Sequence, residues 1–306
     1  MLRSMLGRLR TFWWDEILGQ RRIVADLRQI RRHMSSLDAM LRYLDIEALA
    51  AADGRHSDPL SLPRHHGRVY SQNGEDGIIA EIFRRIGTRT RTFIEIGIGE
   101  GQENNTRFLV EQGWSGVWIE GNPRHAKAAA ERYSEVVAAG RLKIVSGYAT
   151  PDGIDDLLDT VDAPEEVDLL SLDIDQHTTH VWRALHRRAR VSCIEYNASL
   201  PPSSPLEVPY DAATVWDGTN WFGGGLKAIE IIGAAKGLNL VGCDIFGVNA
   251  FLVDARETAG KFRQPFNAET HYQPPRYGRP GHRPANEARV WQNMRIEVRS
   301  GPGMVD

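Results

Sequence analysis

Short apolar runs recur along the middle of the chain, about 25 residues apart, as expected for successive strand and helix units. The runs rich in branched and aromatic residues predict strands at 92–96, 116–120, 142–146, 168–172 and 191–195. Amphipathic stretches between and before them predict helices at 75–86, 104–112, 123–139, 153–160 and 178–188. This alternation is typical of a doubly wound parallel sheet.

The pattern changes after residue 225. A predicted helix at 225–236 leads to two apolar runs, 238–242 and 249–253, with a short connection between them. A parallel crossover needs a dozen or more residues, so these two strands must be antiparallel. The predicted fold class is therefore α/β, a Rossmann-like seven-stranded sheet that is parallel except for a terminal antiparallel hairpin.

A different pattern occupies residues 1–52. Apolar residues alternate at spacings of four and three, which is the a/d seam of a coiled coil. They are Ile23, Leu27, Ile30, Met34, Leu37, Leu41 and Leu44. We expect a homo-oligomer through residues 23–44; the alternative is a long amphipathic helix laid against its own domain. Residues 53–69, which contain prolines and glycines, are interpreted as a linker.

Residues 1–14 combine arginines with Trp13 and Trp14 on one predicted helix. Basic residues beside tryptophans can hold a helix at an anionic membrane surface. The alternative is a solvated face whose tryptophans pack on a partner.

The segment 255–306, rich in proline and arginine, is interpreted as a C-terminal extension that is either solvated or brings arginines to an acidic acceptor.

Composition excludes several classes of protein. The chain has 306 residues, of which 42% are hydrophobic and 25% charged, and its formal net charge is −3. These values are ordinary for a globular protein, and they give no basic footprint for nucleic acid. The two cysteines, Cys193 and Cys243, lie in apolar runs, which favours a reducing compartment. With no secretory signal or membrane span visible, we expect a cytoplasmic protein.

The first predicted strand ends in a glycine-rich turn with Gly97, Gly99 and Gly101. Glycine there allows strained backbone angles and close approach to a ligand. The second strand ends in Glu120, where a carboxylate can accept both hydroxyls of an adenosine ribose. Glu95 precedes the turn, where an ammonium group of a ligand would lie. The alternative is a glycine turn of purely structural use.

Several strings together resemble the FkbM-type S-adenosylmethionine-dependent methyltransferases. They are SQNGEDGII at 71–79, FIEIGIGEGQENNT at 93–106, GWSGVWIEGNP at 113–123, LLSLDID at 169–175, IEYNAS at 194–199 and GVNAFLV at 247–253. The resemblance covers about 70–254 and implies a methyltransferase domain there. It also implies cofactor contacts from Ser71, Gln72, Glu95, Gly97, Gly99, Gly101, Glu120 and Tyr148. Relatives often carry Asp-Gly where this chain has Asp175-Gln176, which leaves the backbone and the base at that point open.

Acidic and amide side chains follow the fourth and fifth predicted strands. Ligands of open α/β sheets lie beyond the carboxyl ends of the strands, where these side chains should converge. Asp173, Glu195 and Asn197 are hard oxygen ligands suited to Mg²⁺ or another divalent cation. The layout is similar to that of metal-dependent catechol and macrolide-sugar methyltransferases. The alternatives are direct binding of sugar hydroxyls by these groups, and structural caps.

A sugar hydroxyl must lose its proton when it accepts a methyl group, so a base is needed. His177 is the first candidate, Asp175 the second and His180 the third. A neutral imidazole has the pKa for this task, although capping or surface positions are the alternative for each histidine.

The long insertion 198–224 supplies candidate acceptor contacts, unless it folds on its own aromatics. These contacts are Tyr210, Asp211, Trp216, Trp221 and Phe222.

The resemblance thus implies an S-adenosylmethionine-dependent O-methyltransferase. Its expected acceptor is a sugar hydroxyl of a polysaccharide, a glycolipid precursor or a glycosylated metabolite, with a divalent metal. The basic segment 1–14 suggests peripheral contact with the inner face of the membrane. One alternative is an oligomerising or membrane-docking module whose methyltransferase-like domain lacks catalysis. A nicotinamide-dependent oxidoreductase is disfavoured, because Gln102 replaces a fingerprint glycine and because of the terminal hairpin.

Overall fold

The computed structural model describes residues 30, 44, 48 and 57–276. Contacts divide the chain into two units, 1–54 and 55–306. In the first unit, Ile30 and Leu44 of the predicted seam are helical and about half exposed. The rest of the predicted coiled coil, the segment 1–14 and the tail beyond residue 276 lie outside the described residues.

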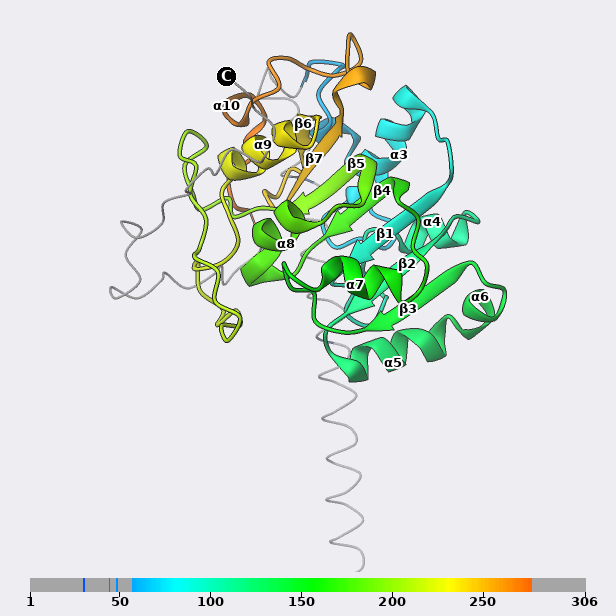
Figure 1. Ribbon diagram of the computed structural model, residues 1–306. Helices are drawn as coiled ribbons and strands as arrows, with labels where there is room; N and C mark the ends of the chain where they lie inside the picture. Colours follow the sequence, from blue (N-terminus) through cyan, green and yellow to red (C-terminus); the bar gives the residue numbers. More distant parts are fainter. Residues whose placement is uncertain (1–29, 31–43, 45–47, 49–56, 277–306) are drawn as a thin grey trace, which may run out of the picture. The chain divides into compact units, whose positions relative to one another are not determined.

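A seven-stranded sheet runs through the second unit, with strand order β3-β2-β1-β4-β5-β7-β6 (Figure 1). The strands are β1 Thr92–Ile96, β2 Ser115–Glu120, β3 Leu142–Ser146, β4 Glu166–Leu172, β5 Arg188–Glu195, β6 Leu238–Cys243 and β7 Asn249–Asp254. All neighbouring pairs among β1 to β5 are parallel, and β7 is antiparallel to both β5 and β6. This confirms the predicted Rossmann-like fold with its terminal hairpin.

Helices cover both faces of the sheet, and each face has its own apolar core (Figure 1). The larger helices are α3 Glu75–Ile86, α4 Arg107–Glu111, α5 Pro123–Arg132, α6 Ser134–Ala138, α7 Ile154–Asp159, α8 Thr178–Ala184 and α9 Leu226–Ala235. The buried residues of α7, α8 and α9 belong to one core, and those of α3, α4 and α5 mostly to the other. Their apolar positions recur at helical spacing, as in Ile78, Ile79 and Ile82 of α3.

Three short helices complete the described part: η1 Pro63–His65, η2 Asp175–His177 and η3 Ala255–Glu257, with α10 Ala268–His271 near its end. No helix among the described residues is long and apolar enough to cross a membrane.

Several element boundaries differ from the sequence prediction. β5 begins at Arg188, three residues before the predicted start, and α8 correspondingly ends at Ala184. The start of β5 was missed because its first residues include arginines, which do not continue the apolar pattern. Arg190 is buried by ion pairs rather than by apolar contacts. The predicted helix 123–139 is two helices, with a break at Tyr133.

Two segments interpreted as peripheral pack into the domain. Leu62, in the predicted linker 53–69, is fully buried with its side chain against Gly242. In the predicted extension 255–306, Phe262 and Ala268 are buried, and the Tyr196 hydroxyl donates to the Gln273 carbonyl over 2.8 Å. The described parts of both segments therefore belong to the folded unit, and a solvated extension is wrong for 255–276.

Candidate active site

The glycine turn after β1 has the backbone that the sequence predicts. Gly97, Gly99 and Gly101 have φ values of 89°, 56° and 69°, a region that other residues rarely adopt. A Cβ on Gly97 would lie 1.7 Å from the Asp173 carbonyl oxygen, and one on Gly101 would lie 3.0 Å from the Trp118 ring. The protein's own packing thus leaves no room for a Cβ at Gly97 and little at Gly101, whereas at Gly99 only the backbone angle favours glycine.

The carboxylate of Glu95 accepts hydrogen bonds from the segment that follows the glycine turn. One carboxylate oxygen accepts from the Asn105 backbone N–H over 2.7 Å. The other accepts from the Asn104 amide and from both the backbone N–H and the hydroxyl of Thr106. Burial raises the pKa of Glu95, and these donors oppose that rise. Glu95 therefore holds the segment between the glycine turn and α4, and a contact of its carboxylate with a ligand's ammonium group stays a prediction.

Glu120 lies at the end of β2, beside the glycine turn. Its carboxylate accepts from the Gly99 backbone N–H over 2.7 Å and from the Asn122 backbone N–H over 2.8 Å. The carboxylate and the glycine turn are thus joined directly. Glu120 thus lies at the exit of the strand next to β1, and its contact with a ribose stays a prediction.

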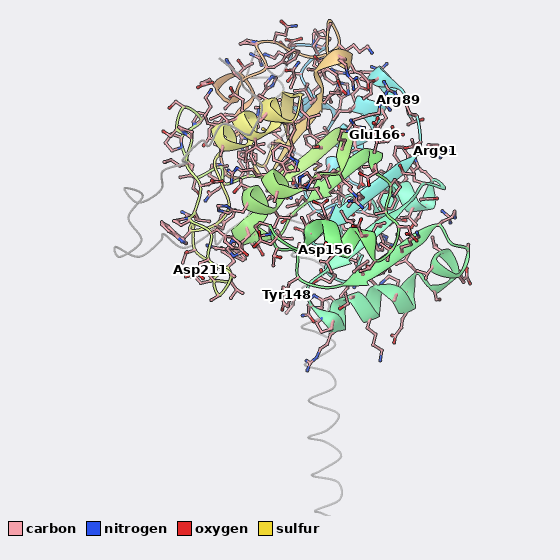
Figure 2. The ribbon with its side chains drawn as sticks, viewed as in Figure 1. Arg89, Arg91, Tyr148, Asp156, Glu166 and Asp211 are labelled. Carbon is pink, nitrogen blue, oxygen red and sulfur yellow. The ribbon has the colours of Figure 1, made fainter. Side chains whose placement is uncertain are left out.

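The other predicted cofactor residues lie in different environments. Ser71 is fully buried, and its hydroxyl and backbone N–H both donate to the Asp76 carboxylate, so it fixes the start of α3. Gln72 is exposed. Tyr148 follows β3, is 75% exposed, and lies against Gly121, where a Cβ would come within 2.8 Å of its ring. Figure 2 shows Tyr148 and Asp211 at one end of the sheet, and Arg89, Arg91 and Glu166 at the other.

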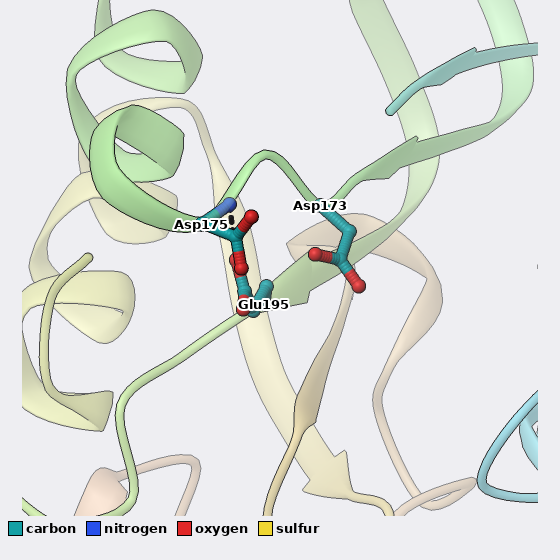
Figure 3. Close-up of side chains that lie close together, drawn as sticks. All are labelled: Asp173, Asp175 and Glu195. Carbon is teal, nitrogen blue, oxygen red and sulfur yellow. Dashed lines mark hydrogen bonds between the residues drawn. The ribbon is translucent and has the colours of Figure 1, made fainter. Parts of the chain in front are cut away.

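Three carboxylates meet at the exits of β4 and β5 (Figure 3). Each of Asp173, Asp175 and Glu195 offers an oxygen that lies within 4.8 Å of the others, and we call this group the acid triad. Burial, followed by the charge of Asp175, raises the pKa of Asp173 to about 7. Burial and the charge of Asp173 raise the pKa of Glu195 well above its usual value. Two of the three predicted metal ligands, Asp173 and Glu195, thus lie together. The third member of the cluster is Asp175, which was predicted as a base.

The backbone of Asp175 is strained. Its φ of 56° lies in the left-handed region, which costs a non-glycine residue free energy. The strained turn directs its N–H to a Glu195 carboxylate oxygen at 2.9 Å (Figure 3). The Thr178 hydroxyl donates to the same oxygen over 3.1 Å. Thr178 was not predicted as a site residue, although a threonine at the start of a predicted helix was a signal for such a contact.

Asn197, predicted as the third metal ligand, has another role. It is fully buried, and its amide group donates to the carbonyls of Asn220 and Phe222. Its amide oxygen accepts from the Ser199 backbone N–H over 3.0 Å. All of its polar atoms thus hold the base of the insertion 198–224, and in this arrangement Asp175 takes the place in the cluster that was expected for Asn197.

The two candidate histidines also hold the insertion. His177 Nε2 lies 3.2 Å from the Thr214 carbonyl, and His180 Nε2 lies 2.7 Å from the Val208 carbonyl. Because a carbonyl only accepts, both Nε2 atoms carry the proton. The second ring nitrogen of His177 is buried without a hydrogen-bond partner, and burial lowers the pKa of this histidine. Burial therefore favours the neutral form of His177, whose buried second ring nitrogen is an acceptor without a partner.

The insertion places its aromatic residues unequally. Tyr210 is 39% exposed, and its ring lies 4.9 Å from His177. Asp211 is exposed and caps the turn at Ala213 and Thr214, and the Thr214 hydroxyl and the Ala213 N–H lower its pKa. Phe222 is buried, so its face is not offered to an acceptor.

The two tryptophans of the insertion make contacts within it. Trp216 donates from its indole to the Thr219 carbonyl and packs edge-on against Phe222. Trp221 packs against the small core of Leu200 and Val208. The insertion is also held by Arg183 on α8, whose guanidinium contacts both oxygens of Glu207 at 2.8 Å. Sequence reasoning missed this ion pair, because its partners are distant in sequence.

No family model and no curated protein matches this chain. Among solved structures, the pyocyanin biosynthetic protein PhzM has a TM-score of 0.35 and 14% identity over 57% of this chain and 54% of that one. An O-methyltransferase from Bacillus cereus in complex with S-adenosylhomocysteine has a TM-score of 0.32 and 18% identity over 51% and 66%. The N-terminal domain of EvdMO1, in the presence of S-adenosylhomocysteine and D-fucose, has a TM-score of 0.42 and 13% identity over 60% and 83%. This chain thus spans little more than half the length of the first of these proteins.

Proposed function

We propose that this protein is an S-adenosylmethionine-dependent O-methyltransferase. The observation that carries the proposal is the row of groups along one edge of the sheet. Glu120 lies at the exit of β2, the glycine turn at β1, and the acid triad at β4 and β5, and these strands are neighbours. A nucleoside cofactor held at β2 and β1 would present its reactive end to the triad.

The chemistry needs three things from the chain. A hydroxyl oxygen of the acceptor attacks the methyl carbon, the carbon–sulfur bond pair returns to sulfur, and the hydroxyl proton leaves to a base. The glycine turn and Glu120 would hold the cofactor, while the triad would orient the hydroxyl in line with the methyl group. Asp173 is our first choice of base, because its carboxylate is half-buried and its backbone carbonyl lies against Gly97, at the cofactor end of the triad.

The donor set of the triad also fits a divalent cation. Three carboxylates lie within 4.8 Å of one another, and oxygen donors of this kind suit Mg²⁺ or Ca²⁺. Asp173, Asp175 and Glu195 would hold the ion. When bound, it would supply Lewis acidity that lowers the pKa of the acceptor's hydroxyl.

For the acceptor, we propose a sugar hydroxyl of a glycan, glycolipid precursor or glycosylated metabolite, in line with the FkbM resemblance. Tyr210 and Asp211 on the insertion support this choice, because a pyranose ring stacks on aromatic faces and its hydroxyls bind carboxylates. The predicted self-association through 23–44 and the membrane contact through 1–14 remain proposals of the same kind.

The test is methyl transfer from labelled S-adenosylmethionine to a panel of glycosides, with and without prior chelation by EDTA. We expect labelled product with the wild-type protein, and a loss of at least roughly ten-fold in Asp173→Asn, as for removal of a general base. Turnover that is unchanged after chelation would contradict the proposed role of the metal but would be consistent with the proposed transferase activity. Absence of cofactor binding in calorimetry would contradict the proposal as a whole.

A further inference from the structure

The order of the strands determines which part of a bound cofactor meets the acid triad. β2, β1, β4 and β5 are adjacent, so Glu120 and Asp173 are separated by two strand spacings, roughly 10 Å. The Asp173 carbonyl also lies against Gly97, and its N–H donates to the Ile96 carbonyl over 3.0 Å. If the ribose lies at Glu120 and the cofactor extends across the glycine turn of β1, its sulfur lies on the side of Asp173.

The triad has no basic side chain to balance it. Among the residues that the structure describes, no lysine, arginine or histidine forms an ion pair with Asp173, Asp175 or Glu195, and the groups that act on them are mostly other acids. The insertion 198–224 contains no lysine, arginine or histidine and adds Asp211 and Asp217, whereas its Glu207 is paired with Arg183 of α8. Any charge that Asp173 or Asp175 carries is therefore not neutralised by a basic side chain, and it makes the site negative where the transferred methyl group would lie.

Methyl transfer changes the charge of the cofactor at this point. The sulfonium of S-adenosylmethionine is positive, and the thioether of S-adenosylhomocysteine is neutral, whereas the adenosine and amino-acid parts are identical. A carboxylate that lies close to the sulfur thus interacts differently with the two forms, while Glu120 interacts equally with both.

We propose that the acid triad makes this site select the charged cofactor over the neutral product, so that the transfer step itself weakens binding and promotes product release. The inference rests on the proposed function and assigns a second role to the triad, in regulating occupancy by the cofactor. A unit charge near a carboxylate at the edge of a protein changes affinity by roughly ten-fold or more.

The experiment is calorimetric titration of the full chain with S-adenosylmethionine, S-adenosylhomocysteine and sinefungin, in EDTA and without acceptor, at about pH 8, above the pKa of about 7 of Asp173. Sinefungin carries an ammonium group in place of the sulfonium methyl, so it should follow S-adenosylmethionine. We expect Asp173→Asn to weaken binding of both charged ligands by roughly ten-fold and to change binding of S-adenosylhomocysteine by less than about two-fold. Asp175→Asn, which keeps the shape of a second triad residue, should act in the same direction.

The matched control is Glu120→Gln, which should weaken all three ligands by the same factor because the ribose is common to them. Saturating Mg²⁺ should narrow the preference of the wild type, since the ion offsets two of the triad's charges. If Asp173→Asn and Asp175→Asn leave the ratio of the affinities unchanged, the inference is wrong although the proposed function stands. If the wild type binds none of the ligands, the inference and the proposed function are both wrong.

Discussion

Asp168 and Asp173 are five residues apart on and just after the same strand, yet they lie in opposite electrostatic environments. Asp168, in β4, is fully buried and accepts from the backbone N–H groups of Arg89, Thr90 and Arg91. Arg190 of the neighbouring strand contacts it at 2.6 Å. These donors lower the pKa of Asp168 despite its burial, whereas the pKa of Asp173 is raised to about 7.

This difference distinguishes buried acids that stabilise the fold from buried acids that are available to a ligand. At the amino end of the sheet, Asp168 has both a row of N–H donors and the cation Arg190, which also binds Glu257 at 2.6 Å. At the carboxyl end, the acid triad has two hydrogen-bond donors to one oxygen of Glu195 and no cation among the described residues. Uncompensated buried acids destabilise a fold, so they are typical of sites that serve a ligand.

The largest expected effect comes from breaking the compensated end. Arg190→Ala leaves Asp168 and Glu257 without their common cation and should lower the free energy of unfolding by about 3–5 kcal/mol. Arg188→Ala is the matched control, because Arg188 is exposed and pairs with the exposed Glu166, and it should cost less than about 1 kcal/mol. Urea denaturation measures both, and equal losses would contradict the distinction between the two ends.

The two aspartates themselves should respond with opposite signs. Asp168→Asn removes the charge that Arg190 needs and should destabilise the protein by about 2–3 kcal/mol. Asp173→Asn relieves repulsion within the triad and should stabilise it by about 1 kcal/mol while methyl transfer is lost. Thermal unfolding without metal tests this pair, and destabilisation by Asp173→Asn would mean that the triad is compensated after all.

The same contrast predicts the dependence of stability on pH. An unfolded aspartate ionises near pH 4, whereas Asp173 ionises at about pH 7 in the fold. Between these values the unfolded state loses the proton first, so this group lowers stability progressively as the pH rises, and the effect is complete above about pH 7. The stability of wild type relative to Asp173→Asn should therefore fall between pH 4 and 7. Asp168 acts oppositely, stabilising above about pH 4 and losing that contribution as the pH falls.

The smallest expected effect concerns backbone strain at the triad. Asp175→Gly removes both the carboxylate and the left-handed penalty, while Asp175→Asn removes the charge alone. The glycine variant should be more stable than the asparagine variant by about 1 kcal/mol at most. A difference of the opposite sign in chemical denaturation would show that the loop is not strained at this position.

The sheet and the convergence of acids at its edge could be predicted from the sequence, and the roles of individual polar residues could not. Thr92–Ile96 and Leu142–Ser146 were predicted with the observed bounds, because their apolar runs end sharply at polar or glycine residues. Strand order brought Asp173 and Glu195 together. Whether a buried polar group serves the backbone depends on contacts that sequence spacing does not show. Glu95, Asn197 and His180 therefore had to be reinterpreted from the structure.

The contact between Gly97 and the Asp173 carbonyl limits how this protein can change. A side chain at position 97 would collide with the β4 exit even in a variant that no longer used a cofactor. Neither loop can therefore be exchanged alone, and a chimera or redesigned variant must transplant both from one parent. Gly99, which has open space around its Cβ position, is the place in the turn where sequence diversification should begin, with asparagine as the first replacement because it tolerates a positive φ.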